Sequence, residues 1–405
     1  MSRWRSVAGF LALRRNTALL LVALLLACTG ERLWLGFAPK YLQFLGAGTL
    51  IIGLFDALQT LLGAVYAYPG GWLTDQWGQR RSLLLFNALS LAGYLLILIW
   101  QHWLALVLGA FLFLAWSALS LPATFSVVAT SLDRRKHTMG IGVQSMVRRV
   151  PMMAGPLIGG WLITRYGWKE GVRFALCGCI ALSVLTMVFQ WFMGEPSALA
   201  ERPAQLSNSQ VSFLEVVKQF NPTLRELLVS DILIRFCERL PYAFVILWAM
   251  NHAGLDAKQY GVLVAIEMIT AMLCYIPVAH LADKHGQRPF VLATFAFFTL
   301  FPLSLLWAHN FAWLAVAFAV RGLKEFGEPA RKALIIAQAP ADLRARTYGA
   351  YYLIRDCIVT AGSLIGAWLW SIGPQANFLG AALCGFLGTV WFWRVVVRGD
   401  LQPSG

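Results

Sequence analysis

Long apolar stretches alternate with short polar ones along almost the whole chain. Each apolar stretch holds roughly 20 residues, the length of helix that crosses the hydrocarbon core of a bilayer. We therefore predict an all-α, polytopic membrane protein with twelve transmembrane helices. The predicted spans are 17–39, 47–68, 81–100, 103–128, 139–164, 173–193, 226–250, 259–280, 289–307, 311–335, 346–372 and 376–393.

The composition and the position of the charges agree with this pattern. Hydrophobic residues make up 59% of the chain and charged residues only 13%, whereas soluble domains carry about a quarter charged residues. Lys and Arg gather in alternate loops, and basic residues in short loops stay in the cytoplasm. We expect both termini in the cytoplasm of a bacterium, with the multi-pass chain in the inner membrane. The net charge of +14 then reflects topology and contact with the lipid bilayer, not binding to nucleic acid.

Internal repeats divide the chain into two similar halves. The segment WLTDQWGQR at 72–80 returns as HLADKHGQR at 280–288, an offset of 283 − 75 = 208. The segment AGPLIGGWL at 154–162 returns as AGSLIGAWL at 361–369, an offset of 361 − 154 = 207. Matches at nearly the same offset and in chain order indicate a duplicated six-helix unit with parallel halves. We predict one six-helix bundle over 1–194, a cytoplasmic linker over 195–223 and a second bundle over 224–405.

The first repeated segment carries a recognisable loop pattern, G-x-L-x-D-x-x-G-x-R-R. It resembles the loop between the second and third helices of the major facilitator superfamily of secondary transporters. The resemblance covers nearly the whole chain and implies two bundles that move a solute by alternating access, and we expect a monomer. Gln76 replaces the usual basic residue after the Asp, and Ala279 replaces the first Gly of the second copy. The motif also includes Leu73 and Leu281, and the residues carried over to gating are Gly71, Asp75, Gly78, Arg80 and Arg81, with Asp283, Gly286 and Arg288 in the second copy.

A second pattern lies in the fifth predicted helix, PMMAGPLIGGWL at 151–162. It is similar to the glycine and proline motif of exporters in the same superfamily, although Pro151 replaces the first Gly. The resemblance implies export, while ordinary packing of small residues between helices is the alternative. The residues that carry it are Gly155, Pro156, Gly159 and Gly160.

Charged residues inside the predicted spans are the candidates for solute binding. A charge at the centre of a bilayer costs about 2.5–3.5 kcal/mol even on the most lenient scale, so these side chains must face a polar interior. We expect Glu31 to pair with Arg148 or Arg149, and Glu238 with Arg355. The predicted substrate-binding residues are Glu31, Arg32, Arg148, Arg149, Glu238, Arg239, Arg321, Lys324, Glu325, Arg355 and Asp356, and further charges in the spans are Asp231, Arg235 and Glu328.

Four charges of the tenth predicted helix, Arg321, Lys324, Glu325 and Glu328, lie at i, i+3, i+4 and i+7. This spacing places them on one helix face. That face either lines a cavity or forms a compensated ladder in which residues four apart pair with each other.

Proton coupling requires a carboxyl group that can gain and lose its proton. Asp56 and Glu267 have no basic residue in their own apolar spans, so burial should favour their neutral forms with little opposition. We predict that at least one of them couples transport to protons. The alternative is a neutral acid that only hydrogen-bonds across the bundle.

The sequence shows no sign of an enzyme. It contains no H-E-x-x-H, G-x-S-x-G or nucleotide-binding loop, and we expect no cofactor and no metal site. The predicted function is proton-coupled secondary transport of a small polar, ionic or zwitterionic solute, with export slightly favoured. Two alternatives stay open: proton symport that takes up an organic anion or siderophore-like chelate, and a membrane sensor that transports nothing.

Asp75 should govern switching rather than binding. The resemblance implies that its carboxylate faces the N-terminal end of the eleventh helix, whose free N–H groups favour an anion, and so closes the cytoplasmic side. Asp75→Asn should slow net transport in proteoliposomes while ligand affinity changes by no more than a few-fold. Asp283→Asn should have a milder effect. Equal losses of binding and transport in Asp75→Asn would contradict this role.

Overall fold

The structure is a computed structural model that describes residues 15–131, 137–193, 213–340 and 344–397. Within these ranges, the side chains of Gly71, Asp75, Arg148 and Asp283 are among those that are not described. Every regular element in the described ranges is a helix, as predicted. The chain divides into two compact units, of which the first comprises Met1–Gly46 and Leu62–Ser207 and the second Ala47–Leu61 and Asn208–Gly405.

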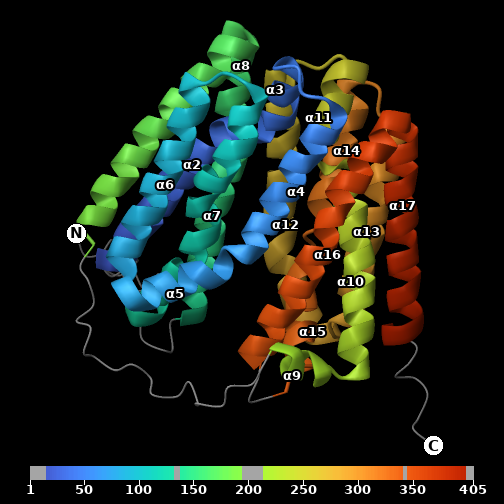
Figure 1. Cartoon of the computed structure of the whole chain (residues 1–405). Coiled ribbons are helices and arrows are strands. Elements are labelled where there is room, and N and C mark those ends of the chain that lie inside the picture. The colour runs from blue at the N-terminus through green and yellow to red at the C-terminus, as the bar shows by residue number, and fades with distance from the viewer. Residues whose placement is uncertain (1–14, 132–136, 194–212, 341–343, 398–405) are drawn as a thin grey trace, which may run out of the picture. The chain divides into compact units, whose positions relative to one another are not determined.

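The first unit is built mainly from α2, which packs along α8, and from α6, which packs against α7 (Figure 1). Within α8 the backbone turns at Gly167, where φ is 79° and ψ is 173°, so this element contains the predicted fifth and sixth helices. The elements of this unit are α2 (Arg15–Trp34), η1 (Leu35–Phe37), α3 (Ala38–Phe44), α5 (Ala67–Trp77), α6 (Gln79–Ile99), α7 (Trp103–Ser131) and α8 (His137–Trp191).

The second unit centres on α10, which packs against α16 and α17, while α12 packs against α14. It also includes most of α4 (Thr49–Val65). Its other elements are α9 (Phe213–Lys218), α10 (Pro222–Tyr242), α11 (Val245–Leu247), the π-helical η3 (Trp248–His252), α12 (Ala257–His285), α13 (Arg288–Trp307), α14 (Phe311–Leu323), α15 (Glu328–Ala337), α16 (Arg344–Ile372), α17 (Pro374–Trp391) and the π-helical η4 (Phe392–Val397).

Seven helices in the described residues are long and apolar enough to cross a membrane. One of them, residues 149–191, contains the turn at Gly167 and therefore two of the predicted spans. Four predicted spans are not among the seven: 47–68, 103–128, 226–250 and 311–335. The first two correspond to the shorter apolar helices Thr49–Val65 and Trp103–Ala118. In the third, α10 carries several charges, and the fourth is interrupted between α14 and α15.

The repeated motif, expected as a loop between two helices, is mostly helical. In the first copy α5 continues to Trp77, and α6 begins directly after Gly78. In the second copy α12 continues to His285 before Gly286. The φ and ψ angles are 85° and 162° at Gly78, and 86° and 158° at Gly286. Glycine adopts a positive φ without steric cost, so one glycine makes the same turn in each copy.

The duplication also appears in the closest helix contacts of each unit. A Cβ atom on Gly159 of α8 would lie 1.7 Å from the carbonyl oxygen of Leu33 in α2. A Cβ atom on Gly366 of α16 would lie 2.2 Å from the carbonyl oxygen of Leu240 in α10. Both residues of the second pair are offset by 207 from the first, since 366 − 159 = 240 − 33 = 207. The small residues of the helix-five motif therefore permit close packing of two helices.

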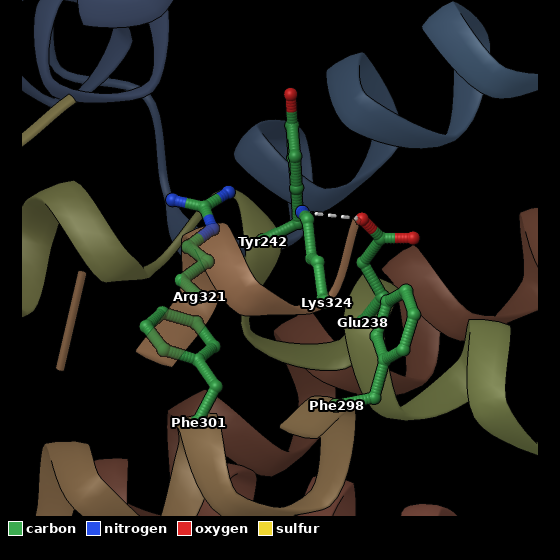
Figure 2. A pocket seen from close by; sticks show the side chains of 6 residues that line it. All are labelled: Glu238, Tyr242, Phe298, Phe301, Arg321 and Lys324. Carbon is green, nitrogen blue, oxygen red and sulfur yellow. Dashed lines mark hydrogen bonds and ion pairs between the residues drawn. The ribbon is translucent and has the colours of Figure 1, made fainter. Parts of the chain in front are cut away.

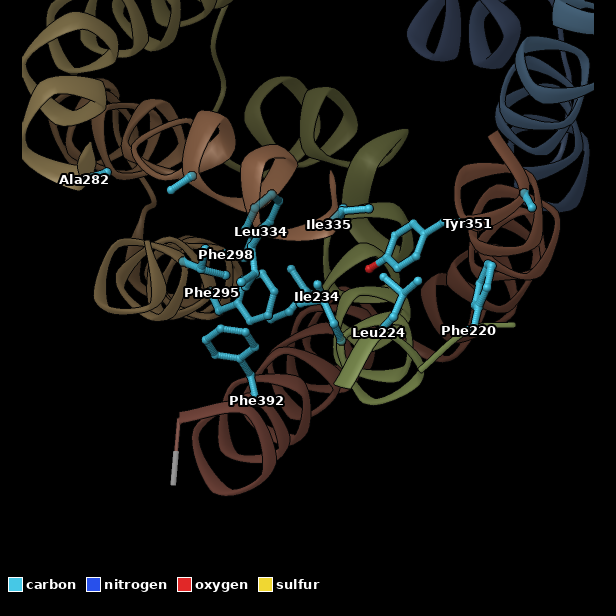
Figure 3. Close-up of a cluster of buried hydrophobic side chains, with 14 of the residues drawn as sticks. Phe220, Leu224, Ile234, Ala282, Phe295, Phe298, Leu334, Ile335, Tyr351 and Phe392 are labelled. Carbon is cyan, nitrogen blue, oxygen red and sulfur yellow. The ribbon is translucent and has the colours of Figure 1, made fainter. Parts of the chain in front are cut away.

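An apolar cluster in the second unit joins residues of several of its helices (Figure 3). The rings of Phe295 on α13 and Phe392 in η4 lie 5.1 Å apart between centroids, and Ile234 of α10 and Leu334 of α15 are buried in the same cluster. Phe298 belongs to this cluster and also lines the cavity described below. Packing of the core thus fixes one wall of the candidate site.

Gly366→Ala should destabilise the protein, because the added methyl group would overlap the backbone of α10. Overpacking of this kind costs about 1–3 kcal/mol. Thermal unfolding of the purified protein in detergent measures the effect. Gly349→Ala is the matched control on the same helix, since a Cβ atom there meets nothing within 4 Å, and it should leave stability unchanged or slightly higher. Equal melting temperatures for the two variants would show that α10 and α16 do not pack this closely.

Candidate functional site

Buried charged side chains are concentrated in the second unit. Removing an ionised group from water is costly unless it is paired and hydrogen-bonded. In the described part of this unit, the charged residues classed as buried are Asp56, Asp231, Glu267, Arg321, Lys324, Arg331 and Arg355. Each of them has an ion-pair partner.

A small cavity, with room for about one water molecule, lies among some of these groups (Figure 2). Lys324 donates to the Oε1 atom of Glu238 at 2.8 Å, and its Nζ lies 3.6 Å from Oε1 of Glu267. Arg321 Nε lies 3.3 Å from the same Glu267 oxygen. The cavity therefore presents both signs of charge beside aromatic rings. Its lining consists of Glu238 and Tyr242 from α10, Phe298 and Phe301 from α13, Arg321 from α14 and Lys324.

A break in the tenth predicted helix places Lys324 at the cavity. The helix stops at Leu323 and resumes at Glu328. In the break, the N–H of Gly327 donates to Thr294 Oγ1 at 2.6 Å, and a Cβ atom on Gly327 would lie 2.3 Å from the Phe290 carbonyl oxygen. The prediction of one continuous charged face over this helix is therefore wrong. Lys324 pairs with Glu238 of α10 and Glu267 of α12. Glu328 lies beyond the break and pairs with Arg331. The two residues of the predicted ladder pair therefore bind other partners instead of each other.

A second group of charges surrounds Asp231, whose side chain is fully buried in α10. Its Oδ2 atom accepts hydrogen bonds from Arg331, from Tyr351 at 3.2 Å and from Arg355 at 3.4 Å. Arg331 also binds Glu328 at 2.6 Å. One carboxylate of α10 thus holds donors from α15 and α16 together.

Arg235 joins the two groups into one chain of ion pairs. Its NH1 atom donates to Glu238 at 2.7 Å and its NH2 atom to Glu328 at 3.2 Å. Positive and negative groups alternate along this chain of ion pairs. It contains five groups of each sign, so the formal charges of its ten members sum to zero. In order, the chain is Arg321, Glu267, Lys324, Glu238, Arg235, Glu328, Arg331, Asp231, Arg355 and Asp356.

Both carboxylates predicted to carry protons have a basic partner. Arg239 NH1 lies 3.3 Å from Asp56 Oδ1, and Ser363 donates to Asp56 Oδ2. Glu267 lies between Arg321 and Lys324. The absence of a basic residue from their own helices therefore does not isolate them in space, because the partners come from other helices.

The structure brings together some of the predicted binding residues and separates others. Glu238, Arg321, Lys324, Arg355 and Asp356 belong to the alternating chain, as described above. The expected pairing of Glu238 with Arg355 is wrong, since Glu238 binds Lys324 and Arg235. Glu325 and Arg149 are half-buried, and the side chain of Arg148 lies outside the described residues.

In the first unit, Glu31 is buried in α2, and Arg32 packs against Gly155, where a Cβ atom would lie 2.4 Å from that of Arg32. Of the predicted gating residues, Gly78 and Gly286 form the turns, and the Arg80 guanidinium lies 4.5 Å from the centre of the Trp191 ring. The side chains of Asp75 and Asp283 lie outside the described residues.

Arg331 is the functional candidate that the sequence analysis missed. It falls near the end of a predicted span, next to Lys332, where a basic residue is expected to face the cytoplasm. Its side chain is only 1% exposed. The signal that could have identified it is Glu328, three residues earlier on the same helix face.

Comparison with known proteins decides the family. The sequence profile of the Major Facilitator Superfamily matches residues 19–237 and 227–404. The chain belongs to the Major Facilitator Superfamily. The multidrug resistance protein MdtG of Enterobacter lignolyticus is 23% identical, over 93% of this chain and 91% of MdtG. Sugar efflux transporter A of Escherichia coli is 24% identical, over 72% of this chain and 73% of its own length.

Solved structures agree with the family at the level of the fold. The crystal structure of the nucleoside transporter NupG matches this chain with a TM-score of 0.79 and 12% sequence identity, covering 94% of this chain and 99% of NupG. As a Major Facilitator Superfamily protein, the chain is an integral multi-pass membrane protein and a transporter of the MFS type, not an enzyme.

Asp231→Asn should strongly destabilise this MFS transporter, because Arg331 and Arg355 would lose their shared carboxylate while they remain buried. Breaking a buried pair in this way costs roughly 3–5 kcal/mol. The control is Glu170→Gln, which removes an exposed pair with Arg173 at 3.2 Å and should cost less than about 1 kcal/mol. Melting temperatures in detergent compare the two. A shift for Asp231→Asn as small as that of the control would contradict the central role of Asp231.

Proposed function

We propose that the protein is a proton-coupled secondary active transporter that exports a small polar, ionic or zwitterionic solute by alternating access. The observation that carries this proposal is the alternating chain of buried and partly buried charges that reaches the aromatic-lined cavity. A transporter for apolar solutes alone has no use for ten charged groups, each of which is costly to bury.

The arrangement of the cavity supports a charged or zwitterionic solute. Arg321 and Lys324 lie beside Glu238 and Glu267, so a solute can exchange ion pairs with either sign of charge. Tyr242, Phe298 and Phe301 offer ring faces to the uncharged part of the same solute. Because the ten ion-paired groups have no net charge, a zwitterion can bind without leaving an uncompensated charge.

Export is supported by the helix-five motif at Gly155, Pro156, Gly159 and Gly160, and by the names of two relatives, a multidrug resistance protein and a sugar efflux transporter. The proposal includes twelve spans in two six-helix bundles, over 1–194 and 224–405, with both termini in the cytoplasm and the protein in the bacterial inner membrane. The repeated turns at Gly78 and Gly286 are compatible with a latch in each copy.

The role of Asp56 and Glu267 depends on their arginine partners. Each of these carboxylates lies within 4 Å of an arginine whose charge it balances, so we infer that both act as counter-charges for Arg239 and Arg321. Asp56→Asn and Glu267→Gln should then weaken solute exchange and gradient-driven flux together in proteoliposomes. Loss of gradient-driven flux with exchange retained would instead make that residue the proton carrier.

The function is tested in everted membrane vesicles with an acidic interior and a fluorescent pH probe. Addition of a transported solute should release protons from the vesicles, because export is coupled to their return. Organic cations, zwitterionic amino acids, organic anions, sugars and neutral apolar compounds are added separately. Glu238→Gln should lower the response at least several-fold, since Glu238 binds Lys324, which lines the cavity with it. Glu170→Gln, on an exposed pair, is the matched control and should respond like the wild type.

A response limited to neutral apolar compounds would contradict the proposed solute class. A solute that moves protons into the vesicle lumen together with itself, or no response to any class, would contradict export by antiport.

A further inference from the structure

We propose that Lys324 is the proton-carrying group of this transporter and that its substrate is an organic cation, which replaces the Lys324 ammonium between Glu238 and Glu267. This inference rests on the proposed function, because it names the solute class and the coupling residue of the same site.

The chemistry of the five cations in the alternating chain singles out Lys324. The other four, Arg235, Arg321, Arg331 and Arg355, carry guanidinium groups that stay protonated in proteins. A buried lysine, in contrast, can lose its proton when its surroundings change. Lys324 is therefore the member of this chain that can switch from positive to neutral while remaining in place.

The position of Lys324 suits this role. It lies in the break between α14 and α15, at the cavity, with its side chain 10% exposed. Its Nζ atom is 2.8 Å from Glu238 and 3.6 Å from Glu267, and 5.8 Å from the centre of the Phe298 ring. The charged and titratable groups around it are Glu238 and Tyr242 on α10, Glu267 on α12, Arg321 on α14 and Glu325 in its own turn, with Tyr260 of α12 beside Arg321.

Charge balance links the binding of a cation to the release of one proton. The alternating chain of ion pairs has no net charge when all ten members are ionised. An added cation therefore leaves one uncompensated positive charge in a buried site, which is unfavourable. If the Lys324 ammonium gives a proton to water and becomes a neutral amine, the sum returns to zero. The solute cation then takes the two carboxylates and the aromatic ring faces, which also attract cations.

The reverse step completes the cycle. When the site opens to the other side, a proton binds the Lys324 amine, and the regained ammonium competes with the cation for Glu238 and Glu267. One positive charge leaves for each one that enters, so the exchange is an antiport of cation against proton. An anionic solute could not displace this proton, because its binding favours the charged form of Lys324.

The test uses the purified full-length protein in detergent with two probes of fixed charge, tetraphenylphosphonium and tetraethylammonium. Equilibrium dialysis measures binding from acidic to alkaline pH, and a pH dye in weak buffer measures proton release. Wild-type protein should bind at least one probe, more tightly as pH rises, and release about one proton per bound cation, as linkage requires.

Two substitutions separate charge from titration at this position. Lys324→Arg keeps the positive charge but cannot release the proton, so it should bind the probe more weakly and release no protons. Lys324→Gln is permanently neutral, so it should bind the probe with little dependence on pH and allow exchange without gradient-driven flux. Lys332→Arg is the matched control, because Lys332 lies on α15 with its side chain 45% exposed, and it should behave like the wild type.

The outcomes distinguish this inference from the proposed function. If neither probe binds the wild type, or if Lys324→Arg releases protons like the wild type, the inference is wrong. If the wild type moves another solute class with protons and Lys324→Arg does so equally, the inference fails while the proposed function stands. If no solute class is coupled to protons in vesicles, both fail. Should Lys324→Arg not fold, the pH dependence of binding by Lys324→Gln decides, and a dependence like that of the wild type overturns the inference.

Discussion

Asp231 is the carboxylate on which the buried charges of the second unit depend. It lies on α10, at the centre of that unit, and accepts hydrogen bonds from residues of α15 and α16 through a single oxygen atom. Arginine side chains as buried as those of Arg331 and Arg355 are tolerated only when an anionic group pairs with them. Glu267, Glu238 and Glu328 are each shared by two cations of these ion pairs, so the loss of one carboxylate affects partners on more than one helix.

The break in the tenth helix determines how this network reaches the cavity. A continuous α-helix would hold Lys324 and Glu328 one turn apart on one face. The turn at 324–327, fixed by the Gly327 bond to Thr294, lets Lys324 join α10 and α12 while Glu328 joins Arg235 and Arg331. Discontinuous helices of this kind are where membrane transporters commonly build polar sites. The apolar cluster around Phe295 supports the same region from the other side.

The sequence allowed the fold to be predicted more fully than the site. The apolar periodicity and the 207-residue offset identified a helical membrane protein and its duplication, and the glycines at 159 and 366 pack as small residues should. Ion-pair partners were harder to predict, because helix spacing indicates which residues share a face but not which face of another helix they meet. Asp56 and Glu267 appeared isolated for this reason. Arg331 was missed because basic residues near the end of a span usually face water.

The close contact between α10 and α16 has a consequence for how the two copies can be compared. Ser363 corresponds to Pro156, since 363 − 156 = 207, and three residues later Gly366 packs on the Leu240 carbonyl as Gly159 packs on that of Leu33. The shared glycine preserves the helix geometry, so the neighbouring position is free to diverge. A proline side chain cannot donate a hydrogen bond, whereas the Ser363 hydroxyl binds Asp56. The two copies therefore keep the same close helix packing. In the second copy, Ser363 adds a polar contact with Asp56 that the side chain of Pro156 could not make. Residues at equivalent positions in the two halves are thus not interchangeable.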